Sequence, residues 1–305
     1  MATSAIEVHG AVKRYGAIEA VNGVDLVIET GEVFGLIGHN GAGKSTLFKL
    51  MLGLIPATAG DIHIGGSPVR GERFRQVRRH LGYLPENVVL YDNLNGLETL
   101  EFFASLKDVP QSACAPMLER VGLAHAGDRR VKAYSKGMRQ RLGFAQALLG
   151  DPKLLFLDEP TNGLDPEGIR DFYGILREQQ AQGVTIILTS HILSEIQERV
   201  DRLAIMKTGR IQALGTVASL REEMNLPLWF ELRVAPEAQD AVRSALAHLD
   251  IGTTNTDTDG DRITVHCPRA AKMAVLEALS GFGGRIADLN IREPSLEDVF
   301  LGYSG

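Results

Sequence analysis

The stretch from Gly38 to Thr46 constrains this chain of 305 residues more than any other part of the sequence. It reads GHNGAGKST and fits the pattern G-x-x-x-x-G-K-[ST], in which a glycine-rich turn surrounds phosphate groups with backbone N–H groups. The apolar run Val33–Ile37 before it is typical of a buried strand, and residues 45–54 carry leucine and methionine at helical spacing. A helix that starts directly after the loop offers its positive end to the same anion. The motif therefore predicts a site for a nucleoside triphosphate.

Residue types within this loop predict different roles. We expect the ammonium group of Lys44 to reach the β and γ phosphates and the hydroxyl of Ser45 to ligate Mg²⁺. Upstream of the loop, the ring of Tyr15 can stack on a base, although for a tyrosine taken alone ordinary packing is the favoured explanation. The predicted nucleotide-binding loop consists of Gly38, His39, Asn40, Gly41, Ala42, Gly43, Lys44, Ser45 and Thr46.

An apolar run that ends in two carboxylates forms the second feature, at residues 154–159. Its four apolar residues predict a strand buried on both faces, as in a parallel sheet. Asp158 at the strand tip can hold Mg²⁺ through water, and Glu159 can orient or deprotonate a water molecule. His191 follows another predicted buried strand, Val184–Thr189, at the sheet edge where ligands of parallel sheets bind. Two acids after a phosphate loop indicate nucleotide hydrolysis.

A third feature is the predicted helix that opens at Ser135. A serine at this position is a plausible N-cap, and the first N–H groups of the helix stay unpaired, so they can bind an anion. One apolar face of this helix is predicted to contain Met138, Leu142, Ala145 and Leu149. Taken alone, the segment is an ordinary helix start.

Composition limits the partners and the location of the protein. Hydrophobic residues make up 44%, charged residues 23%, and the net charge is -6, which argues against a polyanionic partner. Residues 70–79 contain five arginines, for which a solvated surface is favoured over a nucleic-acid patch because the protein as a whole is acidic. No apolar run has the length of a membrane span, no signal peptide is visible, and two cysteines are too few for a disulfide framework. We expect a cytoplasmic protein.

In combination, these motifs resemble those of ABC-transporter ATPase subunits, from Ile6 to about Met224. The resemblance implies an α/β fold: a P-loop ATPase domain at residues 1–225 with a mixed core sheet, an antiparallel β subdomain and a helical subdomain at about 87–150. It assigns ATP and Mg²⁺ as cofactors, Tyr15 as the adenine-stacking residue, Glu159 as the catalytic base and His191 as the switch histidine. The family's signature sequence corresponds to Ser135, Lys136, Gly137 and Met138.

The remaining assignments also come from the resemblance. Asp165 matches the D-loop aspartate, and the Mg²⁺ ligands are expected to be Ser45, Asp158 and Glu86. A glutamine is usual where Glu86 stands, so this residue brings an additional negative charge to the triphosphate site. The signature also departs from the family, which more often has Gly and Gln at positions 136 and 138. We expect these departures to leave the ATPase activity in place but to adjust it.

The resemblance further implies the mode of action. Two copies of the chain pair head to tail, and each ATP lies between the phosphate loop of one copy and the signature of the other. The other expected partners are polytopic membrane permease subunits, contacted through residues 87–103, and a periplasmic accessory protein, with no nucleic acid. The subunit would thus be peripheral on the inner face of the cell membrane. The resemblance is greatest to cassettes of copper-site maturation in nitrous oxide reductase.

The residues after the cassette form a separate predicted domain, 226–305. Strands at Leu228–Val234, 251–256, Arg262–Cys267 and 285–292 alternate with helices at 236–249 and 269–282, which is the β-α-β-β-α-β order of ferredoxin-like domains. Its last residues resemble the end of ABC-2-type cassettes. The neighbours His266 and Cys267 point to opposite faces of a strand, so a joint metal site is not expected.

Two alternative functions stay open. A soluble ABC protein acting on nucleic acid or ribosomes usually carries paired cassettes or long insertions, whereas this chain has one cassette and a compact tail. A P-loop GTPase would carry an Asn/Thr-Lys-x-Asp guanine motif, which the sequence lacks. The favoured hypothesis is the energy-coupling ATPase of a membrane transporter.

Overall fold

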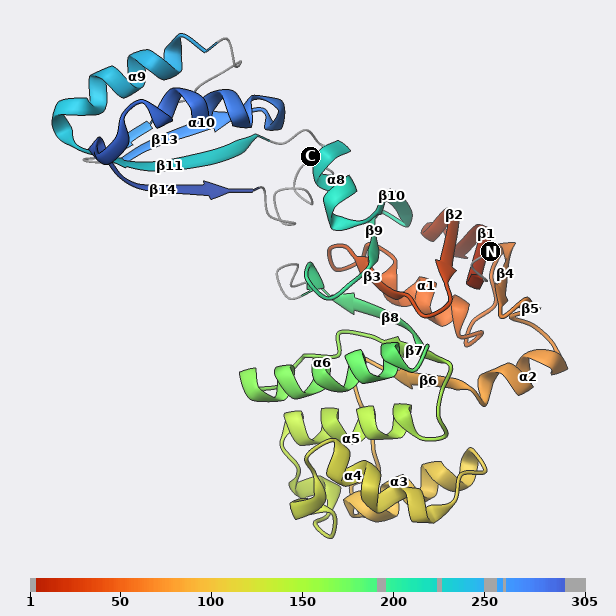
Figure 1. Cartoon of the computed structure of the whole chain (residues 1–305). Helices are drawn as coiled ribbons and strands as arrows, with labels where there is room; N and C mark the ends of the chain where they lie inside the picture. Colours follow the sequence, from red (N-terminus) through yellow and green to blue (C-terminus); the bar gives the residue numbers. More distant parts are fainter. Residues whose placement is uncertain (1–3, 191–195, 224–226, 250–256, 260–261, 294–305) are drawn as a thin grey trace. The chain divides into compact units, whose positions relative to one another are not determined.

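The computed structural model of the protein describes residues 4–190, 196–223, 227–249, 257–259 and 262–293. The chain divides into two compact units, residues 1–214 and 215–305 (Figure 1). The division falls earlier in the chain than the predicted boundary at residue 225. None of the described helices has both the length and the apolar character that a membrane span requires.

The first unit is built on a six-stranded sheet. Its strand order is β10-β9-β3-β8-β7-β6, and every neighbouring pair from β9 to β6 is parallel. Three of the four inner strands, β3, β8 and β7, are buried along their whole length, as their largely apolar sequences predict. The strand bounds are β3 Val33–Ile37, β6 Leu81–Leu84, β7 Leu154–Leu157, β8 Thr185–Ser190, β9 Arg202–Lys207 and β10 Arg210–Gly215.

An antiparallel sheet of order β2-β1-β4-β5 lies beside the central sheet. Its strands are β1 (Ser4–Tyr15), β2 (Ile18–Glu29), β4 (Ala59–Ile64) and β5 (Ser67–Pro68). The alternation of apolar and polar residues in β1 and β2 gives one buried face, which packs into a common core with α1 (Lys44–Met51). The antiparallel pairing predicted for these strands is confirmed.

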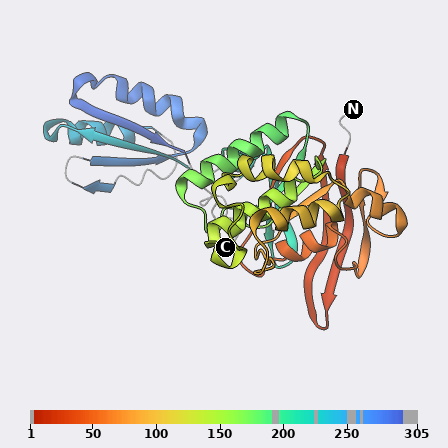
Figure 2. The ribbon, with the colours of Figure 1, turned by 90° about the horizontal axis from the view of Figure 1, so that it is seen from below.

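Helices cover the rest of the first unit (Figure 2), where the yellow and green helices lie in front of the central sheet. Their bounds are α2 Glu72–Arg78, α3 Gly96–Leu106, α4 Cys114–Arg120, α5 Lys136–Leu148 and α6 Pro166–Ala181. The helices α3, α4 and α5 fall within residues 87–150, where the helical subdomain is expected. Pro116 lies in the first turn of α4, where its missing N–H group costs no intrahelical hydrogen bond.

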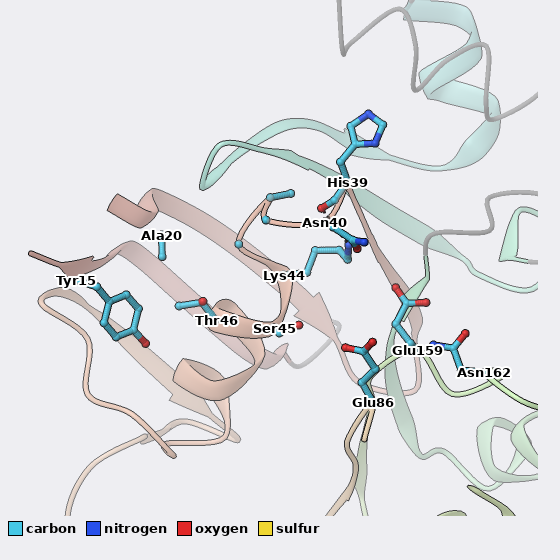
Figure 3. A pocket seen from close by; sticks show the side chains of 13 residues that line it. Tyr15, Ala20, His39, Asn40, Lys44, Ser45, Thr46, Glu86, Glu159 and Asn162 are labelled. Atoms are coloured by element: carbon cyan, nitrogen blue, oxygen red, sulfur yellow. Dashed lines mark hydrogen bonds between the residues drawn. The ribbon is translucent and has the colours of Figure 1, made fainter. Parts of the chain in front are cut away.

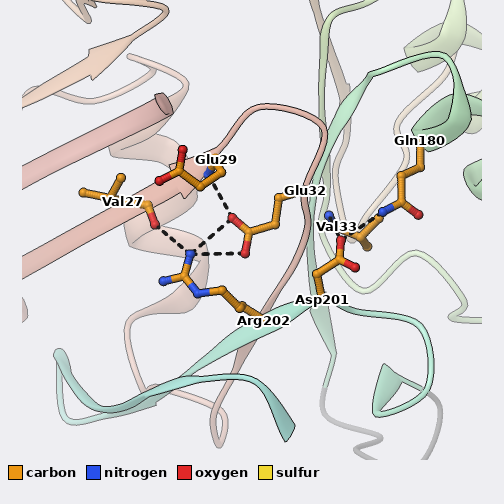
Figure 4. Close-up of polar contacts among 7 residues, drawn as sticks. All are labelled: Val27, Glu29, Glu32, Val33, Gln180, Asp201 and Arg202. Carbon is orange, nitrogen blue, oxygen red and sulfur yellow. Dashed lines mark hydrogen bonds and ion pairs between the residues drawn. The ribbon is translucent and has the colours of Figure 1, made fainter. Parts of the chain in front are cut away.

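A polar network holds the start of β3 in place (Figure 4). Asp201 accepts a hydrogen bond of 2.8 Å from the Val33 backbone N–H and one of 2.9 Å from the Gln180 side chain. Close by, the Arg202 guanidinium lies 3.2 Å from the carboxylate of Glu32. Burial raises the pKa of Glu32, and the backbone N–H of Glu29 together with Arg202 opposes this shift. The network fixes the strand that leads directly into the phosphate loop.

The second unit is an antiparallel sheet with two helices on one face (Figure 1). Its strand order is β12-β13-β11-β14, and its elements are α8 Val217–Glu223, β11 Leu228–Val234, α9 Gln239–Ala247, β12 Asp257–Asp259, β13 Arg262–Cys267, α10 Lys272–Ser280 and β14 Ile286–Arg292. The strand predicted at 251–256 lies outside the described residues. Cys267 is buried in the core, whereas His266 stacks on Trp229, with ring centroids 4.7 Å apart.

Candidate nucleotide site

The loop between β3 and α1 surrounds a pocket of about 400 Å³ (Figure 3). The path of its backbone requires glycine at two positions. A Cβ atom on Gly38 would lie 2.5 Å from the Met206 carbonyl oxygen, and Gly43 has a φ of 105°, a conformation that other residues rarely adopt. Gly43 precedes the first turn of α1 and provides no side-chain cap, so the N–H groups of that turn are available to a ligand.

Lys44 is the buried cation of the pocket. Its ammonium group donates to the carbonyl oxygens of Gly38 and His39, both within the loop. Burial lowers the pKa of Lys44, and the carboxylates of Glu159, Asp158 and Glu86 oppose that shift. The amine therefore lies among the three predicted acids, in a position to balance negative charge.

Asp158 and Glu159 are joined through a single hydroxyl group. Thr189 donates a hydrogen bond of 2.7 Å to Asp158 Oδ1 and accepts one of 2.8 Å from the backbone N–H of Glu159. All three residues are buried, and Glu159 adopts a φ of 48°, which is unusual for a residue other than glycine. Glu159 lines the pocket, whereas Asp158 does not.

The donors predicted for Mg²⁺ are oxygens, which this cation prefers. Ser45 and Glu86 line the pocket together with Glu159, whereas Asp158 is buried and does not line it. Burial, aided by the carboxylates of Asp158 and Glu86, raises the pKa of Tyr83 to about 12. Within the pocket itself, the Ser45 hydroxyl and the Glu86 carboxylate are therefore the oxygen donors that could hold a divalent cation beside substrate phosphates.

Tyr15 also lines the pocket, on the far side of the loop from Glu86 and Glu159 (Figure 3). Its side chain is 49% exposed, and the Lys13 ammonium lies 5.1 Å from the centre of its ring. An open aromatic face at the pocket edge can stack on a base. His39, Asn40, Gly41, Ala42 and Thr46 complete the part of the lining that the sequence predicts.

The predicted signature lies in a different hollow of the same unit, lined by Ser135, Gly137, Met138 and Asp165 among others. Ser135 caps α5 as expected, by accepting a hydrogen bond of 3.2 Å from the Met138 N–H. Lys136 packs along Gly163. Asp165 caps α6 through the Gly168 N–H at 3.0 Å. Within the described part of one chain, the structure does not bring the signature to the phosphate loop.

Three residues of the site were not predicted from the sequence: Thr189, Gln140 and Asn162. Thr189 and Gln140 are buried polar residues that bond to the loop after β7, and Asn162 lines the pocket. The available signal was a threonine at the end of an otherwise apolar strand and a glutamine within a helix that packs against the core. His191 lies outside the described residues.

Comparison with known proteins finds several chains that are similar to this one. A family model for ABC transporters matches residues 21–162. The daunorubicin resistance ATP-binding protein DrrA3 of Streptomyces coeruleorubidus is 35% identical over 313 residues, which spans 100% of this chain and 97% of that protein. The lantibiotic transport ATP-binding protein SrtF of Streptococcus pyogenes is 38% identical over 231 residues, which spans 75% of this chain and 99% of that protein.

Solved structures agree in fold. A structure of the ATP-binding subunit of an ABC transporter aligns with a TM-score of 0.66 at 33% identity, covering 72% of this chain and 92% of that one. The cassette MJ0796, solved as a dimer bound to ADP and Pi, aligns with a TM-score of 0.65 over 70% of this chain and 98% of that one, and at 22% identity it supports the fold alone. The names of the relatives above concern drug and lantibiotic transport, so they do not support the narrower expectation of copper-site maturation. A full-length relative at this identity, together with the phosphate loop and the paired acids, shows that this chain belongs to the ABC transporter family, as an ATP-binding subunit with ATPase activity.

Proposed function

We propose that two copies of this chain pair head to tail and hydrolyse ATP at two composite sites in order to drive a membrane permease. The observation that carries this proposal is the separation of the two hollows in one chain. Lys44 and Glu159 line one of them, and Ser135 and Gly137 line the other. Since both hollows carry helix starts suited to phosphate, a second copy can close each site from the opposite side.

Each residue of the phosphate pocket then has a role in hydrolysis. Lys44 binds the β and γ phosphates, and Tyr15 stacks on the adenine. Glu159 orients and deprotonates the attacking water, because its carboxylate faces the pocket and its backbone is fixed by Thr189. His191 is proposed to contact the γ-phosphate, and Asp165 to belong to the D-loop.

The magnesium ion is proposed to bind Ser45, Asp158 and Glu86. When bound, Mg²⁺ neutralises charge on the β and γ phosphates. The chain would contribute the oxygen donors, of which those of Ser45 and Glu86 line the pocket. Glu86 offers a carboxylate in place of the family's usual amide, and either group can supply an oxygen ligand.

The permease is proposed to dock on the segment after Glu86. Val89 is 87% exposed and Tyr91 is 57% exposed, and the Tyr91 ring lies edge-on to Phe102, with centroids 5.6 Å apart. Exposed apolar side chains gathered on one segment are typical of a protein interface. A docked permease would place the subunit at the inner face of the membrane.

The C-terminal unit is proposed to be a ferredoxin-like accessory domain that follows the ATPase domain. Its β-α-β-β-α-β order and its antiparallel sheet β12-β13-β11-β14 support this assignment. For the cargo, the relatives' names favour a drug or peptide. The copper-site maturation role of NosF rests only on the resemblance of residues 84–86 and 134–138, and it would be tested by the identity of the permease that co-purifies from membranes.

The experiment is Glu159→Gln in the full-length chain. We expect this variant to bind MgATP as the wild type does, to sediment as a dimer in its presence, and to lose at least about a hundredfold in kcat, because general-base catalysis contributes roughly that much. Glu72→Gln makes the same chemical change on an exposed helix end and should leave kcat unaltered. Normal turnover by Glu159→Gln, or full turnover by a wild-type chain that stays monomeric at every concentration, would refute the proposal.

A further inference from the structure

A buried glutamine connects α5, the helix that begins at the signature, to the loop after β7 that contains Glu159 (the catalytic loop). Gln140 lies in the second turn of α5, and its side chain is 3% exposed. Its amide donates a hydrogen bond of 3.0 Å to the carbonyl oxygen of Pro160, the residue directly after Glu159. An unpaired buried polar group costs free energy, so the folded protein is more stable with this hydrogen bond than with the Gln140 amide left unpaired.

This hydrogen bond completes the fixation of Glu159. On the side of the sheet, the Glu159 N–H donates to Thr189 at 2.8 Å. On the side of the helices, Gln140 holds the following residue, Pro160, by donating to its carbonyl oxygen. A backbone with a φ of 48° at a glutamate persists only where its surroundings hold it. Removal of either of these two hydrogen bonds should let the carboxylate move out of its position.

Two other contacts join the same face of α5 to the same loop. A Cβ atom on Gly137 would lie 2.8 Å from the Gly163 carbonyl oxygen, so the two backbones touch there. One turn further along, the Arg141 guanidinium lies 3.5 Å from the Asp165 carboxylate. Positions 137, 140 and 141 follow i, i+3, i+4 spacing and therefore share one side of the helix. The start of α5 and the loop of residues 159–165 form one contact surface.

We propose that Gln140 is a positioning residue that couples the two ATP sites of the dimer, an inference that rests on the proposed head-to-tail pairing. In that pairing, the signature of one copy touches the ATP of its partner, whereas Glu159 of the same copy acts on its own ATP. A shift of α5 when the partner's ATP arrives is passed to the Pro160 carbonyl through the Gln140 amide. Glu159 then reaches its working position only when both sites are filled.

The test is Gln140→Met in the full-length chain, which keeps the side-chain volume and removes the donor. We expect kcat to fall roughly tenfold, the equivalent of one hydrogen bond in the transition state, while KM for ATP stays within twofold. The Hill coefficient for ATP should fall toward one. Gln146→Met is the matched control on the same helix and should change neither quantity. Unchanged kcat and cooperativity in Gln140→Met, with an ATP-dependent dimer still formed by Glu159→Gln, would overturn the coupling and leave the proposed function intact.

A second variant separates positioning from loss of structure. In Gln140→Glu the carboxyl group donates to Pro160 only when it is protonated, and burial among backbone oxygens favours the protonated form. We expect the ratio of wild-type to variant kcat to shrink as the pH is lowered from 8 to 6. A ratio that is constant over this range would contradict the role of the hydrogen bond.

Discussion

Thr189→Val should show how much of the catalytic geometry depends on one hydroxyl group. The substitution keeps the shape of the side chain and removes its oxygen, in a residue that is 0% exposed. Two hydrogen bonds disappear, one of 2.7 Å to the Asp158 carboxylate and one of 2.8 Å from the Glu159 N–H. Both partners are buried, so water does not replace the lost oxygen without a rearrangement.

The magnitude follows from these two bonds. A neutral hydrogen bond contributes about 1 kcal/mol, and a bond to a charged group contributes about 2 kcal/mol. The free energy of unfolding should therefore drop by about 3 kcal/mol. Glu159 loses one of the holds on its backbone, and a catalytic group displaced by a fraction of an ångström to one ångström costs roughly 10- to 100-fold in kcat.

Thr185→Val is the matched control, four residues earlier in the same strand. Its hydroxyl accepts one hydrogen bond of 2.9 Å from the Gly31 N–H, at the end of β8 away from the pocket. We expect a loss of about 1 kcal/mol in stability and an unchanged kcat. Urea unfolding and steady-state ATP hydrolysis measure both quantities. The reasoning is refuted if Thr189→Val retains a kcat within twofold of that of Thr185→Val.

Two other outcomes are expected. Ser135→Glu should abolish hydrolysis and leave the ATP affinity of the monomer nearly intact, as measured by equilibrium binding at low protein concentration; a large loss of monomer affinity would show that the signature belongs to the site of its own chain. Burial lowers the pKa of Lys107 from 10.5 to about 8. Between these two pH values the unfolded chain therefore binds more protons at Lys107 than the folded chain does. The free energy of unfolding should consequently rise by roughly 1–2 kcal/mol as the pH increases from 8 to 10. Urea unfolding at both pH values measures this rise, and Lys107→Met should reduce it; an equal rise in the variant would show that other groups cause it.

Much of the first unit was predictable because its signals are local. Val33–Ile37 and Leu154–Leu157 are continuous apolar runs, and a strand covered on both faces needs that composition. The phosphate loop was predictable for a similar reason, since its glycines meet steric demands within a few residues. The N-cap at Ser135 depends only on the residue three positions later.

The fixation of the catalytic loop was not predictable, because its partners are distant in the sequence. Thr189 bonds across 30 residues to Glu159, and Gln140 bonds across 20 residues to Pro160. A threonine in a strand and a glutamine in a helix have many ordinary interpretations until the fold brings them to the loop.

The carboxylate of Glu86, at a position where the family usually has an amide, changes the charge balance of the pocket. The carboxylates of Glu86, Asp158 and Glu159 all act on the single ammonium group of Lys44. A triphosphate adds further negative charge, and like charges at a few ångströms in a partly buried site repel strongly. Lys44 cannot balance this sum alone, so we infer that nucleotide binding in this chain depends on Mg²⁺ more strongly than it would with a neutral side chain at position 86. Mg²⁺ held by the Glu86 carboxylate would offset the repulsion between that carboxylate and the phosphates.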